Sequence, residues 1–590
     1  MRFVAVFLLG CVAASPQPLS ILPPSLDASG QTIFFGSSLY PDGLKYATDI
    51  YARDSSGVRR LTQIGVDATS TVIEFAVNSD GSQLAYAAVI GNSFILRSVN
   101  LNSGESSSWS CAGQLCFGND TSLHMTGPDN RIIVSGRRRT QFPAEIDSAS
   151  ADGSFTFLSY GILAASPQRV MSDSGLIVFT QYQSVPANVY VMNLDGSNSH
   201  PLTHFPVPPQ GVYTGKVARD ATISQDGGLV VFATNDAALG SRSQIWAVTS
   251  DGLLRSLSEP DENCGSPSLS GDGTLAAFVC KGQLNISRTD GSARRVLTSF
   301  RWSGASSPVM SADGSRVVFT LGPPLSTQRG AIWSIATDTA KLETIYAPRV
   351  LSPRGVVDSL SITNSVSIGD LITAFGMNFT ADSSSVAAER PLPDSLNGIS
   401  LLVNGRSTPI LAVTPWQINA QLPPGVAEGS ATFQVRFEDG SSSNVTKQQV
   451  VESAPQTLFL TSDTYIYPDC QFAVFHAGTG IPADQQHPAA IGEAVEIYAI
   501  GLGPTDPVIP AGVPAPASPP AKSIGPITVY VADYSRQVTA TVLFAGLTPG
   551  LIGIYQINIS VPQGMPGRRQ LALRVKDGPG LGTSCVFWVR

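Results

Sequence analysis

The sequence predicts an all-β protein, with a seven-bladed β-propeller followed by two immunoglobulin-like (Ig-like) β-sandwich domains. Charged residues make up only 14% of the chain, which contains 55 Gly and 42 Pro, and this composition disfavours long helices. A unit built around a Ser-x-Asp-Gly turn recurs through residues 20–349. Residues 356–590 contain one series of short motifs twice. A chain of 590 residues is also too long for a single hydrophobic core.

The repeated unit is clearest from Val170 to Thr203, as strand, turn, apolar strand, loop, strand, Asp-Gly turn and a strand ending in Leu-Thr. Its first turn recurs at intervals of 41 to 52 residues, at Gly30, Gly81, Asn130, Gly175, Gly227, Gly273 and Gly314. Gly and Asn supply the positive φ angles of tight hairpins. Four strands per copy at this period are typical of a propeller blade, so seven copies predict seven blades.

The repeats resemble the WD40-like (PD40) repeats of the TolB family over residues 20–349. The copies that carry the resemblance are Ser25–Phe35, Ala76–Tyr86, Thr222–Phe232, Ser268–Phe278 and Val309–Phe319. The resemblance implies a propeller fold. It implies no particular function, because such propellers serve as scaffolds, receptors and enzyme lids.

Three motifs of the C-terminal part occur in the same order in two copies. Gly369–Phe379 matches Gly492–Gly503, Ile399–Arg406 matches Ile527–Tyr534, and Trp416-Gln-Ile-Asn419 matches Tyr555-Gln-Ile-Asn558. Short strands separated by frequent turns predict two Ig-like sandwiches, at 356–453 and 454–590. We expect the central Ile of each Gln-Ile-Asn motif to face the core, and its Gln and Asn to hydrogen-bond neighbouring turns. Trp416 and Tyr555 are expected to anchor strands, although they could also stack against sugars.

The first C-terminal copy resembles the IPT/TIG class of Ig-like domains. Residues 356–590 together resemble an uncharacterised C-terminal domain of secreted acidobacterial proteins, through motifs such as Val403-Asn-Gly405, Gly501-Leu-Gly503 and Ala545–Gly550. That resemblance assigns no catalytic or binding residues. The Pro-rich stretch Val508–Lys522 is expected to form an extended loop inside the last domain.

The N-terminus has the pattern of a secretory signal, predicted at residues 1–14. An apolar run from Phe3 to Leu9 precedes Val12-Ala13-Ala14, a signal-peptidase site. Leu8–Cys11 also resembles a bacterial lipobox, which would make Cys11 a lipid-modified residue. No later stretch has the ~18 apolar residues of a membrane helix. The mature chain is therefore expected outside the cytoplasm, secreted, periplasmic or tethered to the cell envelope by lipid.

Six cysteines remain beyond Cys11, and they fall into the candidate disulfide pairs Cys111–Cys116, Cys264–Cys280 and Cys470–Cys585. Cys264 and Cys280 lie at equal distances from Asp272, the centre of a predicted hairpin turn. They should therefore face each other on neighbouring strands, within disulfide distance. Buried free thiols are the alternative, whereas a metal site would need His or Cys at a ligand spacing that this sequence does not have.

Several classes of chemistry lack their sequence signals. A net charge of −8 and a single basic run, Arg137–Arg139, argue against a nucleic-acid partner. There is no Gly-x-Ser-x-Gly elbow and no dinucleotide fingerprint. His200 and His204 lie in an extended segment, where this spacing does not converge on a metal. The turn residues Asp80, Asp226, Asp272 and Asp313 are expected to accept N–H groups of their own turns. No catalytic, cofactor-binding or metal-binding residue is predicted, and no cofactor.

These observations favour an exported, non-enzymatic binding or scaffolding protein, whose propeller presents loops to a protein or a cell-surface glycan. Two alternatives remain open at this point. One is a carbohydrate-active enzyme of the propeller itself, a polysaccharide lyase or glycosidase. The other is a purely structural spacer.

Overall fold

The structure is a computed structural model, which describes residues 21–590 except for 41–42, 65–69, 91–92, 111–120, 126–129, 137–143, 151–153, 165–167, 182–185, 207–215, 237–241, 324–328, 361–364, 461–470, 533–535, 565, 576–580 and 583–585. It divides into an N-terminal unit ending at Pro348 and a C-terminal unit that starts at Arg349. Every named regular element in the described ranges is a β-strand. None of these residues forms a helix that is long and apolar enough to cross a membrane.

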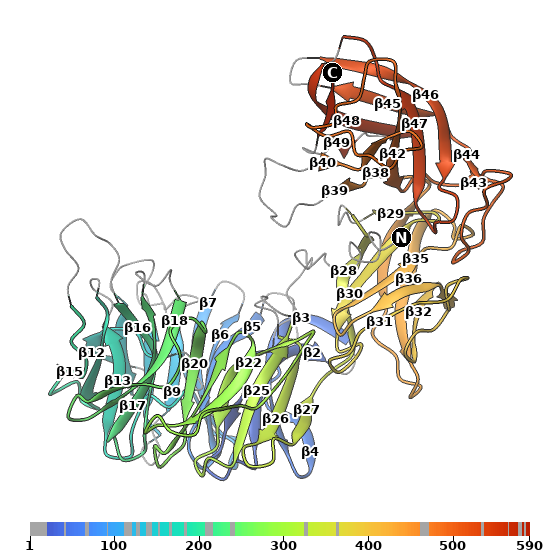
Figure 1. Ribbon diagram of the computed structural model, residues 1–590. Coiled ribbons are helices and arrows are strands. Elements are labelled where there is room, and N and C mark those ends of the chain that lie inside the picture. Colours follow the sequence, from blue (N-terminus) through green and yellow to red (C-terminus); the bar gives the residue numbers. More distant parts are fainter. Residues whose placement is uncertain are drawn as a thin grey trace. The chain divides into compact units, whose positions relative to one another are not determined.

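The N-terminal unit contains consecutive antiparallel sheets, which follow the order of the sequence repeats (Figure 1). The first three sheets are β1 (Ser25–Leu26), β2 (Ile33–Tyr40), β3 (Gly43–Asp54) and β4 (Gly57–Arg60); β5 (Ser70–Val77), β6 (Gln83–Ile90), β7 (Ser93–Asn100) and β8 (Ser106–Ser110); and β9 (Ser122–Met125), β10 (Ile132–Gly136), β11 (Glu145–Ala149) and β12 (Phe155–Tyr160). The fourth contains β13 (Leu176–Gln181), β14 (Asn188–Asn193) and β15 (His200–Pro201).

The remaining sheets of this unit each contain four strands. They are β16 (Lys216–Ile223), β17 (Leu229–Asp236), β18 (Arg242–Thr249) and β19 (Leu254–Ser256); β20 (Cys264–Leu269), β21 (Leu275–Cys280), β22 (Gln283–Arg288) and β23 (Arg295–Val296); and β24 (Gly304–Met310), β25 (Arg316–Gly322), β26 (Ala331–Ala336) and β27 (Leu342–Tyr346). In the fourth sheet, Val170 and Met171 pair with β13 in the place of a first strand.

The repeated sequence motifs explain why each sheet forms. Phe232, Phe278 and Phe319 are fully buried on the second strands of successive sheets, where the apolar triplets place them. The Leu-Thr at the end of a repeat has a separate role. The hydroxyls of Thr62, Thr203 and Thr298 accept the N–H groups of Ile50, Val189 and Leu284 at 2.9–3.0 Å. Each hydroxyl therefore ties the end of a repeat to the third strand of its own sheet.

The first strands of neighbouring sheets contact one another around the propeller axis. Backbone hydrogen bonds link their turns on one face: Asp173 N donates to Gln225 O at 2.8 Å, Gln225 N to Gly271 O at 2.9 Å, and Gly271 N to Ala312 O at 2.7 Å. Ala28 N donates in the same way to Ser79 O at 2.6 Å. The first strand of each sheet therefore lines the central channel, and the Asp-Gly turns mark one end of it.

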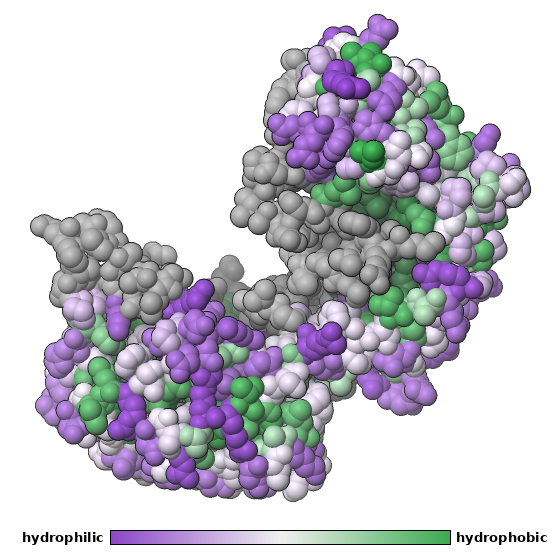
Figure 2. Space-filling view, viewed as in Figure 1, coloured by the Kyte–Doolittle hydropathy of each residue, from purple (hydrophilic) through white to green (hydrophobic). Residues whose placement is uncertain are grey.

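The first and last sheets close the ring without exchanging a strand, because all four strands of each come from consecutive sequence. Their joint consists of side-chain contacts. The rings of Phe35 and Tyr346 lie 4.7 Å apart between centroids. Gly30, with φ +68°, faces Ser311 so closely that a Cβ at Gly30 would lie 3.2 Å from the Ser311 Cβ. The visible outer face of the sheets carries a mixture of hydrophilic and hydrophobic residues (Figure 2).

The first domain of the C-terminal unit is a sandwich of two five-stranded sheets. One sheet has the order β28 (Val350–Asp358), β30 (Leu371–Met377), β35 (Gln417–Gln421), β34 (Ile410–Val413) and β31 (Ser385–Val386). The other has the order β29 (Ser365–Ser367), β37 (Thr446–Val451), β36 (Gly429–Phe437), β32 (Ile399–Val403) and β33 (Arg406–Thr408). Alternating burial along β36 shows one face of this sheet on the core and the other in solvent.

The last domain has one continuous sheet rather than two separate ones. Its main path runs β38 (Gln456–Thr457), β42 (Ala494–Ile500), β47 (Tyr555–Ser560), β46 (Gln537–Leu547), β45 (Ile527–Ala532), β48 (Gly567–Val575) and β49 (Leu581–Gly582). Beside it lie β41 (Val474–His476), β43 (Thr505–Asp506), β44 (Lys522–Ser523) and β50 (Phe587–Val589), and β39 (Phe459–Leu460) pairs with β40 (Gln471–Phe472). The sheet is continuous because β46 pairs with β45 through one end and with β47 through the other.

The two Gln-Ile-Asn motifs occupy equivalent strands, β35 and β47. β35 pairs with β30, and β47 pairs with β42. The strands β30 and β42 carry the first of the duplicated motifs, Gly369–Phe379 and Gly492–Gly503. Ile418 and Ile557 are fully buried, as predicted. The two amides of each motif also bond each other, which was not predicted: Gln417 Nε2 donates to Asn419 Oδ1 at 2.6 Å, and Gln556 Nε2 to Asn558 Oδ1 at 2.9 Å. Residues two apart on a strand share a face, which brings the two amides of each motif together.

Candidate functional site in the propeller channel

Several channel-lining strands contain a β-bulge at the same repeat position. Asp220, Ser266 and Ser307 each lie seven residues before a turn glycine of the repeat, and they adopt φ angles of 53°, 52° and 49°. Strand pairing shifts at the same places in β16, β20 and β24. A shift also occurs before Glu74 of β5, the equivalent position of the second repeat. Such bulges re-aim side chains out of the regular pleat, so these repeats present side chains to the channel at this level.

Gln168 occupies the same repeat position in the fourth sheet, seven residues before Gly175. Its Nε2 donates to the carbonyl oxygen of Pro308 at 3.0 Å, although the two residues are 140 positions apart. Pro308 follows Ser307 in the last sheet, so the Gln168 side chain crosses from one channel-lining strand to another. Its other amide atom, Oε1, is buried and has no hydrogen-bond partner. A buried acceptor of this kind costs free energy unless a ligand or water satisfies it.

Three arginines lie directly beside these positions. Arg169 follows Gln168 and Arg219 precedes Asp220 in the sequence. Arg329 Nε donates to Ser306 Oγ at 3.3 Å, which places its guanidinium next to the bulge at Ser307. The carboxylate of Asp173 acts electrostatically on the Arg169 guanidinium. Arg219 Nη2 donates to Ser243 Oγ at 3.2 Å, and its Nε lies 4.0 Å from Asp220 Oδ2.

Burial acts on the charges of this cluster. Partial desolvation lowers the pKa of Arg169 and of Arg329. The carboxylate of Asp173 opposes the shift at Arg169, and that of Glu74 opposes it at Arg329. Burial raises the pKa of Asp220, and the neighbouring Arg219 opposes that shift. Desolvated guanidinium groups remain charged at any physiological pH, so they favour an anion close by.

The sequence reasoning did not single out Gln168, Arg169, Arg219, Asp220 or Arg329. The sequence did contain a signal for three polar residues at one repeat position. Glu74, Gln168 and Asp220 each lie seven residues before a turn glycine of the repeat. The turn aspartates that were weighed as candidate site residues bind their own turns, as expected. Asp226 accepts Gly228 N at 2.9 Å and Asp313 accepts Ser315 N at 3.0 Å. Hydrogen bonds from serine hydroxyls and these amides lower the pKa of both carboxyls.

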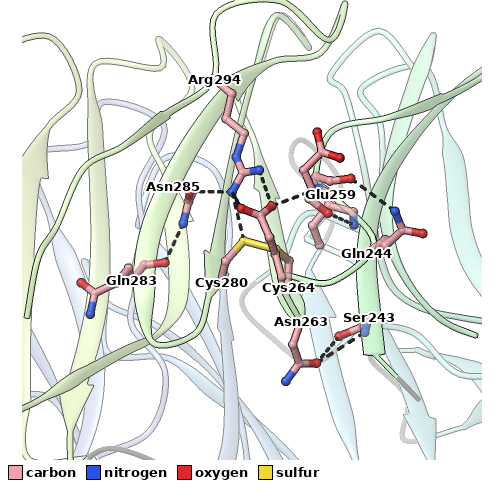
Figure 3. Close-up of a disulfide and its surroundings, with 12 residues drawn as sticks. Ser243, Gln244, Glu259, Asn263, Cys264, Cys280, Gln283, Asn285 and Arg294 are labelled. Carbon is pink, nitrogen blue, oxygen red and sulfur yellow. Dashed lines mark hydrogen bonds and ion pairs between the residues drawn. A yellow bond between two sulfur atoms is a disulfide. The ribbon is translucent and has the colours of Figure 1, made fainter. Parts of the chain in front are cut away.

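The predicted disulfide Cys264–Cys280 is present, with a Cα–Cα distance of 4.1 Å. The two cysteines are paired directly across β20 and β21. Arg294 points toward the bond, and its Nη2 also donates to Asn285 Oδ1 at 2.9 Å (Figure 3). Arg294 forms an ion pair with Glu262 and lies 3.6 Å from Cys280 Sγ. Cys11, Cys111, Cys116, Cys470 and Cys585 lie outside the described residues.

The described residues offer little for a metal site. Within the described ranges, one group of three such side chains comes together, namely Glu262, Cys264 and Cys280. Its two sulfurs are bonded to each other and are not available as thiolates. His200 is exposed and its Nδ1 lies 2.8 Å from Asn198 O, in an ordinary turn contact.

His476 forms an ion pair with Glu493, and this pair makes the last domain sensitive to pH. His476 Nδ1 lies 2.5 Å from Glu493 Oε1. The hydrogen bond to Glu493 raises the pKa of His476 above 6.5, and the pKa of Glu493 is lowered from 4.5, because the bonds from His476 and Ala490 outweigh the effect of burial. The histidine contribution is complete below pH 6.5 and disappears as the pH rises through the raised pKa.

We therefore expect His476→Gln to destabilise the last domain at pH 6 by up to about 1 kcal/mol, and to have little effect at pH 9. Hydrogen exchange of the β41 and β42 amides in the full chain at both pH values measures this difference. His487→Gln is the control, because His487 is exposed and its contact is with Asp484 of its own turn. An equal effect of His476→Gln at pH 6 and pH 9 would contradict this assignment.

The C-terminal unit has a pocket of about 560 Å³ with a predominantly apolar lining. It is lined by Ser359, Leu360, Leu371, Leu458, Phe459, Leu460, Ala473, Phe475, Gly480, Pro482, Tyr498, Ile500, Leu551 and Ile554. Tyr498 donates to Glu496 at 3.3 Å, so its hydroxyl already has a partner. The pocket offers volume and apolar surface, whereas the channel offers unsatisfied polar groups.

These features define an all-β protein with a β-propeller and an Ig-like domain. Residues 356–449 match the IPT/TIG domain family. The chain is similar to an oligogalacturonate lyase from Vibrio parahaemolyticus (12% identity, 55% of this chain and 92% of that one, TM-score 0.40). It is also similar to TolB from Acinetobacter baumannii (15%, 47% and 62%, 0.31) and to the propeller domain of the Trilobed protease from Pyrococcus furiosus (10%, 56% and 97%, 0.38). No curated protein matches the chain. These likenesses concern the fold alone.

Proposed function

We propose that this chain is an exported binding or scaffolding protein whose propeller channel holds the ligand. The observation that carries the proposal is Gln168, which hydrogen-bonds Pro308 of a distant repeat and leaves its Oε1 buried without a partner. A ligand with a hydroxyl or N–H group would satisfy that oxygen. Arg169 follows Gln168 in the sequence and adds a charged group to the same segment.

The test compares two buried glutamines in the full-length chain. Gln168→Leu removes the amide that crosses the channel. Gln244→Leu removes an amide of similar burial. Gln244 lies on β18, which is not a channel-lining strand, and its Nε2 donates to Ser258 O at 3.3 Å. Binding to a glycan array, to peptidoglycan and to envelope peptides is measured for both variants and for the wild type. We expect the wild type and Gln244→Leu to bind the same ligand, and Gln168→Leu to lose at least about tenfold in affinity.

An absence of any ligand for the wild type would overturn the proposal and favour the structural spacer. The enzyme alternative rests on Asp220, because a carboxyl with a raised pKa beside a guanidinium can act as a general acid. Mass spectrometry of the glycan after incubation with the protein distinguishes catalysis from binding. If the wild type forms a cleaved product and Asp220→Asn does not, the protein is an enzyme and the proposal of a non-enzymatic binding protein is wrong.

A further inference from the structure

The apolar pocket beside Tyr498 lies where the two domains of the C-terminal unit meet. Leu360 and Leu371 of the first sandwich line one side of it, and residues of the last domain line the other. Leu371, Ile500 and Ile554 belong to one buried cluster, so the two domains share a core at this place. Small-molecule sites are common at such domain junctions.

Hydrogen bonds and close packing hold the two sides of the pocket together. Gly512 of the last domain donates its N–H to Gln421 Oε1 at 2.7 Å, and its carbonyl oxygen accepts the N–H of Leu392 at 2.8 Å. Gly553 packs so closely on Leu371 that a Cβ at Gly553 would lie 2.8 Å from Leu371 Cδ2. The cavity of about 560 Å³ is therefore preformed. Ligand sites usually measure roughly 300–1,000 Å³.

The wall of the pocket is mainly aliphatic. Among the described residues that line it, seven are Leu or Ile and three are aromatic. The rings of Phe475 and Tyr498 lie 5.6 Å apart between centroids in an edge-to-face arrangement, so they pack against each other. Leu360, Leu458 and Leu551 are only half-buried. A preformed cavity with such walls favours an apolar occupant over water.

The charge behind this wall is negative. The Tyr498 hydroxyl donates to Glu496 Oε2 at 3.3 Å. Burial raises the pKa of Tyr498, and the carboxylate of Glu496 raises it further, so the phenol remains a neutral donor. On the other side of the pocket, Asp358 Oδ1 accepts the N–H of Leu360 at 3.0 Å. Both carboxylates would repel an anionic group inside the pocket.

No cation compensates for these carboxylates at the wall. None of the described lining residues is Lys, Arg or His. His476 follows the lining residue Phe475 on β41, and it is already in an ion pair with Glu493. A buried charge without a partner is strongly unfavourable, so the pocket excludes a carboxylate or sulfonate.

We infer that this pocket binds the aliphatic chain of an uncharged molecule, of the kind that a long-chain alcohol represents. Aliphatic side chains from both domains provide the apolar surface, and the volume suits a small molecule. The site lies in the C-terminal unit and is independent of the propeller channel. It takes a different class of ligand, because it offers no unsatisfied polar group comparable to Gln168 Oε1 among its described lining residues.

Competition for a fluorescent probe tests the inference on the full-length chain. N-phenyl-1-naphthylamine is uncharged, and its emission rises in an apolar site. 1-Decanol and decanoate have chains of equal length and differ in charge. We expect 1-decanol to displace the probe at a concentration about tenfold or more below that of decanoate.

Charge substitutions at the wall separate this site from general partitioning of the alcohol. Leu458→Lys should lower the preference for 1-decanol over decanoate about tenfold, because the ammonium gives the carboxylate a partner. Leu458→Gln, which is polar and uncharged, should keep the preference. Leu543→Lys is the control, since Leu543 is 57% exposed on β46 and does not line the pocket. If Leu458→Lys does not fold, as judged by circular dichroism, Leu551→Lys makes the same comparison from another part of the wall.

Equal displacement by 1-decanol and decanoate, or an unchanged preference in a folded Lys variant of the wall, would overturn the inference. Failure of the probe and of 1-decanol to bind the wild type would also overturn it. Sedimentation would then show whether a second copy of the chain covers the pocket.

Discussion

Ile418→Ala is expected to lower the free energy of unfolding of the first sandwich by roughly 2–5 kcal/mol. Ile418 is fully buried in the core. It lies on the central strand β35, where it pairs with Ala374 of β30. Truncation leaves a cavity among side chains that pack from both sheets, including Val356, Phe433 and Val450. Native-state hydrogen exchange of the β30 and β35 amides measures the loss in the full chain, domain by domain.

Val445→Ala is the matched control in the same domain, because Val445 is 54% exposed. Its effect should stay within about 0.5 kcal/mol. If Ile418→Ala were equally mild, the Gln-Ile-Asn strand would not be part of the sandwich core. The motif would then return to being a candidate ligand-binding element.

The double substitution Cys264→Ala and Cys280→Ala is expected to destabilise the propeller by about 3 kcal/mol, as estimated for a closed loop of this length. The bond joins residues 16 positions apart in a hairpin whose register is already fixed by pairing. It restricts the unfolded chain, and both cysteines are buried in the folded one. Urea denaturation of the full chain, followed by hydrogen exchange of the β20 and β21 amides, measures the difference.

Reductant provides the control for this effect. Dithiothreitol should lower the stability of the wild type toward that of the double variant and leave the variant unchanged. A wild type that stays fully stable after complete reduction, verified by intact mass, would contradict a stabilising role of the bond.

Local signals made the propeller and the sandwich motifs predictable. A Gly at positive φ, such as Gly273 (φ 73°), fixes a hairpin turn, and the turn then sets which residues face each other. The spacing about Asp272 predicted the pair Cys264–Cys280 correctly. The pairing also depends on a bulge between Gly265 and Ser268, which shifts the register by one residue and which the spacing did not reveal. The core position of Ile418 and Ile557 followed in the same way, from alternation within a strand.

The channel cluster could not be predicted because it forms only when distant repeats close into a ring. Gln168 and Pro308 are 140 residues apart, and nothing near either residue indicates that they meet. Arg169 and Arg329 are ordinary loop residues by their sequence surroundings. The continuous sheet of the last domain was missed for a related reason: the alternating pattern of β46 does not say that its two ends pair with different strands.

The most direct test of the central claim, that the ligand site lies in the propeller channel, is a crystal structure of the full-length chain grown with a saturating concentration of the ligand found in the binding screen. We expect difference density beside Gln168, with a hydroxyl or N–H donor of the ligand within hydrogen-bond distance of Gln168 Oε1. Ligand density in the apolar pocket beside Tyr498, or anywhere else with the channel empty, would contradict it.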